Sequence, residues 1–595
     1  MSVFRPYAYF CPMHRFRSRS VLFVAASYLV LSALPLLPAL FGRTLADPAL
    51  LAAATLCSWI AVWAVFKRPA WFHLLLLPAF LMLPAEIYLQ VYFGQSISVH
   101  HLGIIAETSP GEALEFLGNR IWLLAAALVL ALAWFGLAWR AAWRTHALDW
   151  RGPSRAITLV LTGICLGLWL VGGSPMSPSA AAAKKSGTLP SWTRVSVNEK
   201  VLARSWPYGI VLNAASYRKE RRYLAQLSAR SAQFRFGAQQ ASQRDAPQVV
   251  VMVLGESSRA DRWSLNGYER HTNPLLEKET NLVSLTDMIT PVSATRLSVP
   301  VILSRKPATQ SLRAGFSETS FISAYREAGF KTFWLSNQMS FGEFDTPVSV
   351  FAKEADVTRF FNLGGFTNRS DLDDVLLAPL QAAIADPAPK KLIVLHTLGN
   401  HWNYSHRYPQ EFDRWKPSLF GVYKPAYTSL KLKPEINNSY DNSILYTDWL
   451  LSQVIGVLKT GPALASMMYV ADHGQTLYDG SCKLAFHGHN TQFEFHVPAL
   501  VWYSDAYQAA FAGKVAELRQ HRAAPLSTEN MFHSLLDLAD IRYAGEKLDR
   551  SVFSDRLARH VRYVDSYGWT DYDDATLKGD CREVIGRKKP LQREK

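Results

Sequence analysis

The sequence predicts two folds in one chain: a bundle of membrane-spanning helices, followed by a three-layer α/β domain with a mainly parallel sheet. Long uncharged apolar runs dominate the first 173 residues, whereas from residue 247 short apolar runs alternate with helical stretches. Residues 249–253 are all apolar and show no polar alternation, which is typical of a strand buried on both faces of a parallel sheet. A chain of 595 residues is too long for one hydrophobic core, so at least two domains are expected.

Five apolar runs in the N-terminal third are long enough to cross a bilayer, which takes about 20 helical residues. The predicted spans are residues 21–41, 49–66, 70–93, 121–139 and 156–172. The first run lacks a small-residue cleavage site, so we predict an uncleaved span and not a signal peptide. Glu86 lies within the third run. A charge inside a span points to a function or to an interfacial position, and the sequence leaves both open.

The charges between these runs predict the orientation of the spans. The N-terminal segment and the second and fourth loops are basic, whereas the third loop is acidic. The residues concerned are Lys67, Arg68, Arg140, Arg144, Arg151 and Arg155 on the basic side, and Glu107, Glu112 and Glu115 on the acidic side. Because positive loops stay in the cytoplasm, we predict a cytoplasmic N-terminus and place everything after about residue 173 on the opposite side of the membrane.

The net charge of +15 fits either nucleic acid or an anionic membrane surface as a partner. The chain has no zinc-finger, homeodomain or ribonucleoprotein motif, and 49% of its residues are apolar. We therefore predict membrane lipids as partners and no nucleic acid. None of the five cysteines forms a CxxC pair. Cys482 and Cys581 can pair if the C-terminal part lies outside the cytoplasm, which the sequence leaves open.

Composition divides the chain into three parts, with predicted boundaries at 1–173, 174–246 and 247–595. Residues 174–190 are rich in Ser, Ala, Pro and Gly, which is typical of a linker. Residues 191–246 mix aromatic and cationic side chains. This mixture predicts either a helix on the membrane surface or a solvated helix that bridges two domains.

The third part alternates predicted strands and helices, which favours an α/β domain. The predicted strands are 248–254, 331–335, 391–396, 466–471 and 498–503. The predicted helices are 316–329, 371–385, 441–458 and 527–540. Ser527 and the polar residues after it, 528–530, form the expected N-cap of the last helix.

Polar clusters follow the predicted strand ends or lie in nearby loops. Ligands of open α/β sheets bind beyond the carboxyl ends of the strands, so these clusters are expected to meet there. The candidate residues are Glu256, His401, Asp472, His473, His487 and His489. Carboxylates and imidazoles together are the ligands that zinc prefers. For the Gly-Glu-Ser-Ser turn after the first strand, the residues alone leave open a serine nucleophile or a carboxylate metal ligand.

Several of these stretches resemble the inner-membrane phosphoethanolamine transferases of Gram-negative bacteria, members of the alkaline phosphatase and sulfatase superfamily. The stretches are GESSRADRWSLNGYERHTNP, SATRLSVP, HTLGNH, YDNSILYTDWLL, ADHG and FHGHN. The resemblance implies a catalytic threonine at Thr295, and zinc held by Glu256, Thr295, Asp472 and His473. It also implies that His401 and His487 act in catalysis by holding the phosphoryl group or a second zinc. The substrate-binding set is then Asn337, His401, His487 and His489.

The resemblance further implies what the protein does and where. Phosphatidylethanolamine would donate phosphoethanolamine through a covalent threonine intermediate to a lipopolysaccharide or another envelope glycan. The protein would be a monomer in the bacterial inner membrane, with its catalytic domain in the periplasm. The alternatives are a phosphodiesterase, phosphatase or sulfatase-like hydrolase with the same metal site, and a non-catalytic membrane scaffold.

Two features depart from the family pattern. No cysteines flank the nucleophile loop, and Gln475 stands where the family usually has an acidic residue. These departures leave the acceptor open. The turn itself lacks the second glycine of a G-x-S-x-G elbow. With Thr295 as nucleophile, Glu256 becomes the expected metal ligand, and Ser257 and Ser258 the expected turn-capping residues.

Overall fold

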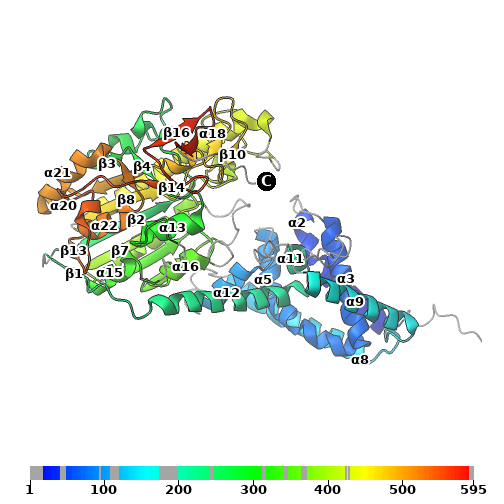
Figure 1. Ribbon diagram of the computed structural model, residues 1–595. Coiled ribbons are helices and arrows are strands. Elements are labelled where there is room, and N and C mark those ends of the chain that lie inside the picture. Colours follow the sequence, from blue (N-terminus) through cyan, green and yellow to red (C-terminus); the bar gives the residue numbers. More distant parts are fainter. Residues whose placement is uncertain are drawn as a thin grey trace, which may run out of the picture. The chain divides into compact units, whose positions relative to one another are not determined.

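The structure is a computed structural model of the chain, shown in Figure 1. It describes residues 18–40, 48–92, 96–107, 120–172, 199–241, 246–310, 317–340, 346–362, 372–422, 425, 429–461 and 463–587. The chain divides into two compact units, residues 1–219 and 220–595. The predicted linker, 174–190, and the acidic loop residues Glu112 and Glu115 lie outside the described residues.

The first unit is helical. Its described helices are α1 (Arg19–Ala33), α2 (Leu37–Leu40), α3 (Pro48–Phe66), α4 (Pro69–Phe72), α5 (Leu77–Tyr92), α6 (Val99–Glu107), α8 (Arg120–Trp143), α9 (Pro153–Gly172), α11 (Glu199–Arg204) and the start of α12 (Gly209–Ser231). Four helical segments among the described residues are long and apolar enough to cross a membrane: Arg19–Leu40, Pro48–Phe66, Pro69–Val91 and Trp122–Trp143. Four of the five predicted spans are thereby confirmed as candidate membrane helices. The fifth, 156–172, lies within α9, which is not among these four, and stays a prediction as a span.

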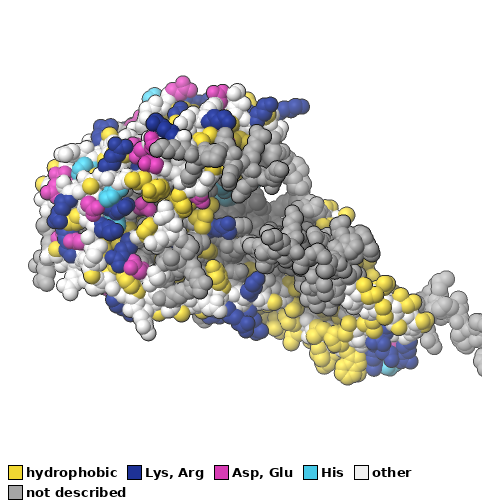
Figure 2. Space-filling view, in the orientation of Figure 1, with side chains coloured by type: hydrophobic (Ala, Val, Ile, Leu, Met, Phe, Trp, Pro, Cys, Tyr) yellow, Lys and Arg dark blue, Asp and Glu magenta, His cyan; other side chains and the backbone are white. Residues whose placement is uncertain are grey.

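Side chains on these helices have the exposure expected of a lipid-facing surface. In α8, Trp122 is 76% exposed and Leu130 is 70% exposed. Figure 2 shows hydrophobic side chains gathered over α8, whereas Lys, Arg, Asp and Glu are scattered over the α/β unit. Glu86 is buried, and its carboxylate accepts hydrogen bonds from Gln90 Nε2 at 2.8 Å and from the Ile97 main-chain N at 2.7 Å. This carboxylate therefore ties α5 to the chain that follows it.

The second unit is built on a seven-stranded sheet within the described residues, in the order β3-β11-β8-β2-β7-β5-β6. The strands are β2 (Gln248–Gly255), β3 (Leu282–Leu285), β5 (Lys331–Ser336), β6 (Val357–Phe360), β7 (Lys390–His396), β8 (Leu464–Ala471) and β11 (Ala499–Tyr503). Strand β2 is central and pairs in parallel with β7 and β8, which explains its unbroken apolar run. Strand β11 runs antiparallel to both β8 and β3.

Helices form the layers on either side of this sheet. One group comprises α17 (Leu377–Ala385) and α18 (Lys433–Lys459), which contact each other and strands β5, β7 and β8. The other comprises α13 (Thr295–Leu303), α15 (Phe321–Glu327), α16 (Thr346–Ala352) and α22 (Asn530–Leu538), which contact one another and, through α15, strand β5. Three further helices of the unit are α19 (Gln492–Phe495), α20 (Asp505–Ala510) and α21 (Ala512–Gln520).

Among the described residues, short strands also form two-stranded sheets apart from the main sheet. They are β1 (Gln239–Gln240) with β13 (Ile541–Arg542), β4 (Met288–Ile289) with β12 (Leu526–Ser527), β9 (Thr476–Leu477) with β10 (Ala485–Phe486), β14 (Tyr563–Asp565) with β15 (Trp569–Asp571), and β16 (Ala575–Lys578) with β17 (Glu583–Gly586).

All five predicted strands are present, and the structure corrects several details of the helices. Helix α15 begins only at Phe321, because Ser320 caps it by accepting a hydrogen bond from Ile322 N. The N-cap of α22 is Glu529, which lies within the predicted cap, whereas Ser527 lies before the N-cap and pairs with Ile289 in the short ladder of β12 and β4. Tertiary strand pairing thus overrides the local capping signal. The sequence pattern also missed α13, which contains Pro300 and only nine residues.

A buried histidine in α22 predicts how the stability of the protein depends on pH. His533 is 5% exposed, and Nδ1 lies 2.7 Å from the Tyr543 hydroxyl. Burial, and after it the charges of Arg550, Lys547, Arg305 and His560, lower the pKa of His533 from 6.5 to about 3. Between pH 6.5 and 3 the unfolded chain therefore binds a proton that the folded chain does not. The free energy of unfolding should fall by up to about 1.4 kcal/mol per pH unit as the pH decreases through this window.

The measurement is the thermal unfolding midpoint of the full chain in detergent between pH 7 and 4. We expect His533→Gln to flatten the decline of the midpoint toward low pH. His271 has a side chain that is 74% exposed, so His271→Gln should leave the slope as it is in the wild type. Equal slopes in wild type and His533→Gln would contradict the prediction.

Candidate metal centre and active site

Glu256, Asp472 and His473 form a compact group of metal-binding side chains. One ligand atom from each lies within 4.8 Å of the others, and all three residues are buried. Glu256 follows β2, and Asp472 and His473 follow β8. These strands are parallel neighbours, with Gly255 opposite Ala471, so the chain leaves both strands at the same level of the sheet. Strand pairing therefore brings together residues that are more than 200 positions apart.

The two carboxylates of this group lie close together, and both are buried. Burial, and then the charge of Asp472, raises the pKa of Glu256 well above its usual value. Asp472 Oδ1 accepts hydrogen bonds from Ser257 N at 3.0 Å and from His473 N at 2.7 Å. Asp472 Oδ2 is buried and has no hydrogen-bond partner among the described residues. An orphaned carboxylate oxygen beside a second carboxylate fits a divalent cation.

His473 is oriented to complete such a site. Its Nδ1 lies 2.9 Å from the Gly474 carbonyl, which accepts the ring N–H and leaves the lone pair on Nε2. Nε2 lies 3.5 Å from Glu256 Oε1 and 3.6 Å from Asp472 Oδ2. Two carboxylates and a neutral imidazole fit zinc in chemistry and number, with room for a fourth ligand.

Thr295 is the first residue of α13 and faces this group. Its hydroxyl donates a hydrogen bond to Glu256 Oε2 at 3.0 Å and lies 3.4 Å from His473 Nε2. The N-terminus of a helix favours anions, because its first N–H groups lack intrahelical partners and the helix dipole is positive there. The threonine hydroxyl is thus placed where it can act as a ligand and also meet a phosphate.

Two of the three other predicted histidines, His487 and His401, lie near the group. The His487 ring centroid lies 4.5 Å from that of His473, and His487 Nδ1 is buried without a hydrogen-bond partner among the described residues. Burial lowers the pKa of His487 to about 2, with further contributions from His473, His401 and His489. Burial likewise lowers the pKa of His401 to about 4. Burial therefore favours the neutral form of both imidazoles.

His489 and Asn337 are placed differently. His489 Nε2 lies 2.9 Å from the Ala485 carbonyl in its own loop. Asn337, at the end of β5, is buried and donates to Asp373 Oδ1 at 2.9 Å. The next residue, Gln338, is the one that reaches the site, with Nε2 3.3 Å from Glu256 Oε2. Substrate binding by Asn337 and His489 stays a prediction.

Ser257 does more than cap a turn, which was its expected role. It has a positive φ of 55°, which is strained for a residue with a side chain. Its hydroxyl donates to Glu256 Oε1 and accepts a hydrogen bond from Gln475 Nε2 at 2.9 Å. Gln475, noted in the sequence only as a departure, thus orients Glu256 through Ser257.

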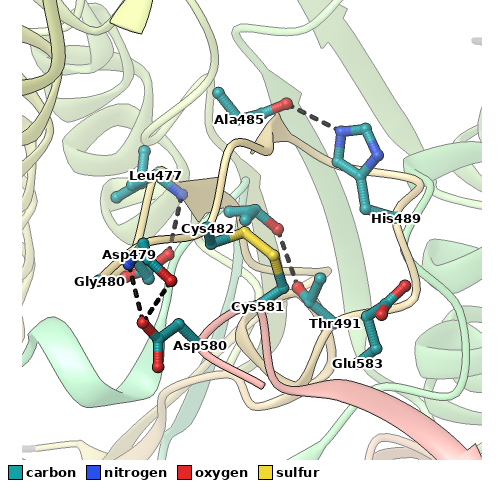
Figure 3. The surroundings of a disulfide bond; sticks show 12 residues. Leu477, Asp479, Gly480, Cys482, Ala485, His489, Thr491, Asp580, Cys581 and Glu583 are labelled. Carbon is teal, nitrogen blue, oxygen red and sulfur yellow. Dashed lines mark hydrogen bonds between the residues drawn. A yellow bond between two sulfur atoms is a disulfide. The ribbon is translucent and has the colours of Figure 1, made fainter. Parts of the chain in front are cut away.

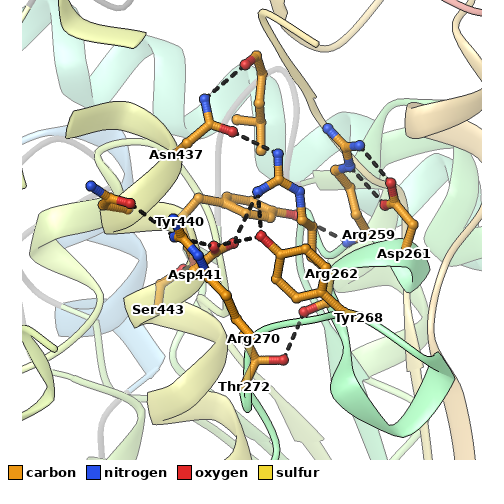
Figure 4. A network of polar contacts seen from close by, with 12 residues as sticks. Arg259, Asp261, Arg262, Tyr268, Arg270, Thr272, Asn437, Tyr440, Asp441 and Ser443 are labelled. Atoms are coloured by element: carbon orange, nitrogen blue, oxygen red, sulfur yellow. Dashed lines mark hydrogen bonds and ion pairs between the residues drawn. The ribbon is translucent and has the colours of Figure 1, made fainter. Parts of the chain in front are cut away.

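Arg259 connects the Glu256 turn to the Asp472 loop, a role that no sequence pattern predicted. Its guanidinium is 1% exposed and donates to Asp479 Oδ1 at 2.9 Å, to the Gln475 carbonyl at 3.3 Å and to Asp261 Oδ2 at 2.7 Å. Figure 4 shows the pair of Arg259 with Asp261 and, near it, the network in which Arg262, Tyr268 and Arg270 bond to the buried Asp441. Because the guanidinium bonds both segments, it holds the two ligand-bearing loops in register.

Two glycines allow the loops around the site to approach closely. A Cβ on Gly474 would lie 2.1 Å from the Phe493 carbonyl, and a Cβ on Gly399 would lie 2.8 Å from the Glu256 carbonyl. Gly399 also has a positive φ of 48°. A side chain at either position would therefore displace the loops that carry Glu256, His401 and His473.

A disulfide between Cys482 and Cys581 answers the question that the sequence left open. Figure 3 shows how it joins the β9–β10 hairpin to the C-terminal hairpin of β16 and β17. Asp580 reinforces the junction by accepting hydrogen bonds from Ser481 N at 2.8 Å and from Ser481 Oγ at 2.7 Å. The loop that carries His487 follows directly after this hairpin, so the disulfide anchors its near end.

Comparison with known proteins supports the same interpretation. Residues 248–541 match the Sulfatase family model. The chain is 29% identical over 328 residues to "Phosphoethanolamine transferase EptC" of Escherichia coli, covering 53% of this chain and 55% of that protein. It is 30% identical over 436 residues to "Putative transferase YhbX" of the same organism, covering 72% of each chain. The chain spans about half the length of most of the phosphoethanolamine transferases that it matches.

A solved structure shares the fold of the second unit. The zinc complex of the C-terminal periplasmic domain of E. coli EptC superposes with a TM-score of 0.50 at 27% identity, covering 56% of this chain and 95% of that domain. A mainly parallel sheet with a carboxylate and histidine site at its carboxyl edge defines a member of the alkaline phosphatase and sulfatase superfamily. Within that superfamily, the chain belongs to the phosphoethanolamine transferase family.

Proposed function

We propose that this protein is a zinc-dependent phosphoethanolamine transferase. It takes phosphoethanolamine from phosphatidylethanolamine, holds it on Thr295 and passes it to a lipopolysaccharide or another envelope glycan. The observation that carries the proposal is the position of the Thr295 hydroxyl. It lies 3.0 Å from Glu256 Oε2, beside the buried group of Glu256, Asp472 and His473. A hydrolase that needed only an activated water would not require a threonine at this position.

Zinc bound by Glu256, Asp472, His473 and Thr295 would lower the pKa of the threonine hydroxyl and offset charge on the phosphoryl oxygens. In the first half-reaction, Thr295 Oγ1 forms a bond to the donor phosphorus, and the bond from phosphorus to the diacylglycerol oxygen breaks. The proton of the threonine hydroxyl ends on the diacylglycerol oxygen. The product is a phosphoethanolamine ester of Thr295, as in other covalent mechanisms.

In the second half-reaction, a hydroxyl or phosphate oxygen of the acceptor attacks the same phosphorus and Thr295 leaves. An imidazole suits the role of base for a hydroxyl acceptor. The unpartnered Nδ1 of His487 favours it for this step. Release of Thr295 restores the enzyme.

The domain organisation fits a lipid donor. We propose that residues 1–173 anchor the protein in the bacterial inner membrane with a cytoplasmic N-terminus, that 174–246 form the linker and bridging helices, and that 247–595 form the catalytic domain in the periplasm. The four candidate spans support the anchor. A disulfide supports an oxidising compartment for the second unit.

The test is the mass of the peptide that contains Thr295 after incubation of the purified full chain with phosphatidylethanolamine. We expect this peptide to gain the mass of phosphoethanolamine while diacylglycerol is released, and to lose that mass when an acceptor is added. Release of diacylglycerol together with free phosphoethanolamine, and no modified Thr295 peptide on rapid quenching, would identify a hydrolase. A protein that releases no diacylglycerol at all would fit the non-catalytic alternative.

A further inference from the structure

The loop that carries His487 has a backbone that needs outside support. It joins β10 to α19, and three of its residues have positive φ: Phe486 at 83°, Gly488 at 88° and Asn490 at 59°. Two of the three are not glycine, and a residue with a side chain adopts this conformation only when its surroundings hold it there. The placement of the His487 imidazole therefore depends on whatever fixes this loop.

Glu494 supplies that support. Its carboxylate is fully buried. One oxygen, Oε2, accepts hydrogen bonds from Gly488 N at 2.7 Å and from His489 N at 3.0 Å. These N–H groups belong to the two residues directly after His487. Two donors at adjacent positions fix the direction of the chain where the His487 side chain departs.

The same residue also fastens the loop that carries the metal ligands. Glu494 Oε1 accepts hydrogen bonds from Thr476 Oγ1 at 2.8 Å and from Thr491 Oγ1 at 3.2 Å. The main-chain carbonyl of Glu494 accepts one from Gly474 N at 2.8 Å. Glu494 thus bonds to residues on both sides of the gap between His473 and His487, whose ring centroids lie 4.5 Å apart.

The described hydrogen-bond donors to the Glu494 carboxylate are main-chain N–H groups and threonine hydroxyls. A buried carboxylate is costly unless its oxygens are satisfied, and a charge-assisted acceptor for several N–H groups gives tight geometric control. This arrangement resembles the way that side chains behind a metal site orient the residues that meet the substrate. A glutamine at position 494 would replace one carboxylate oxygen by an amide N–H₂ group. Because this group is itself a donor, it could not accept the hydrogen bonds of that oxygen, and about half of the bonds would be lost.

We propose that Glu494 is a positioning residue of the transfer reaction: its carboxylate fixes residues 487–491 so that the His487 imidazole faces the phosphoryl group on Thr295. The proposal rests on the proposed function. The bond from Gly474 N in the loop of the metal ligands goes to the main-chain carbonyl of Glu494, which a substitution leaves in place, whereas the Glu494 carboxylate acts on the His487 loop. Its loss should therefore slow the step that uses His487 and leave the capture of phosphoethanolamine by Thr295 in place.

The test compares Glu494→Gln, His487→Ala and the double variant of the full chain. We expect Glu494→Gln to lower kcat for transfer to the acceptor by about 10–100-fold, the range found for residues that orient groups at metal sites. The zinc content and the Thr295 adduct should be retained. Because both changes disable the same step, the double variant should be no slower than His487→Ala alone.

The matched control is Glu354→Gln. Glu354 is another buried carboxylate that accepts hydrogen bonds from a main-chain N–H and from serine hydroxyls, those of Ser320 and Ser323, but it lies beyond α16, before β6. The Glu354→Gln variant should be less stable than the wild type but have the same kcat. If Glu494→Gln does not fold, Thr476→Val removes one hydroxyl donor and should give a several-fold effect in the same direction.

Hydrogen exchange at the amides of Gly488 and His489 tests the positioning role of Glu494 separately from the proposed transferase function. We expect faster exchange there in Glu494→Gln than in the wild type. Unchanged exchange, unchanged kcat, or effects of Glu494→Gln and His487→Ala that multiply would overturn the positioning role. A wild-type protein that forms no Thr295 adduct would overturn the proposed function instead.

Discussion

Thr295→Ala is expected to abolish the phosphoethanolamine adduct and to lower transfer by at least about 10³-fold, because removal of a nucleophile leaves only binding and electrostatic effects. Zinc should stay bound, since the buried Glu256, Asp472 and His473 remain. The measurements are the mass of the peptide, the rate of diacylglycerol release and the zinc content of the purified protein.

Two variants sharpen this prediction. Thr295→Ser keeps a hydroxyl at the start of α13 and should retain a measurable adduct. Ser298→Ala removes a buried hydroxyl in the same first turn, 3.5 Å from the Thr295 carbonyl, and should leave transfer close to the wild-type rate. Joint loss of zinc and activity in Thr295→Ala would make the threonine an essential ligand in place of a nucleophile.

The sequence predicted the framework of the site because local patterns encode it. The apolar runs that became β2 and β8 end at Gly255 and Ala471, and the polar residues that follow them are Glu256 and Asp472. Parallel pairing of such strands brings their carboxyl ends together whatever the loops do. Four candidate spans could be predicted for the same reason, since length and hydropathy suffice.

The parts that could not be predicted depend on contacts between distant residues. The hydrogen bond from Gln475 to Ser257 joins positions 218 apart, and that from Arg259 to Asp479 joins positions 220 apart. Thr295 lies in a nine-residue helix with an internal proline, so no periodicity marked it, and only the family resemblance pointed to it. Glu494 belongs to a four-residue helix between the predicted cluster of His487 and His489 and the predicted strand 498–503, and this helix carries no signal of its own.

Gln475 also bears on the charge of the site. Because residue 475 is a neutral amide, the acidic side chains of the described metal group are Glu256 and Asp472. The Gln475 amide donates a hydrogen bond to the Ser257 hydroxyl, whereas a carboxylate at this position would accept the hydroxyl proton in place of Glu256. The Ser257 hydroxyl is then free to donate to Glu256 Oε1. The departure from the family pattern is therefore compatible with a metal site that keeps its Glu, Asp and His ligands.

Asp472→Asn is expected to weaken zinc binding by more than about 100-fold, exceeding the loss that follows changes behind a metal site, and to abolish transfer with it. Asparagine can keep an oxygen where Oδ1 accepts from Ser257 N and His473 N, so the loop should hold its shape. What the substitution removes is the charge and the ligand at Oδ2, the orphaned atom.

The same substitution should stabilise the protein once metal is removed. In the zinc-free wild type, Glu256 and Asp472 are buried side by side, and the pKa of Glu256 is raised by burial and by the charge of Asp472. Replacing Asp472 by a neutral residue removes that repulsion. With excess chelator, the unfolding midpoint of Asp472→Asn should exceed that of the wild type by about 2 °C or more, whereas with zinc the order should reverse, because only the wild type gains from binding.

Asp441→Asn provides the opposite control. Asp441 is equally buried but pairs with Arg262 and Arg270, so its neutralisation removes the carboxylate that these two cations share and should lower the midpoint with or without zinc, at unchanged metal content. An Asp472→Asn protein that keeps its zinc, or that is less stable than the chelated wild type, would show that Asp472 serves the fold through its main-chain hydrogen bonds and is not held in place for a metal ion.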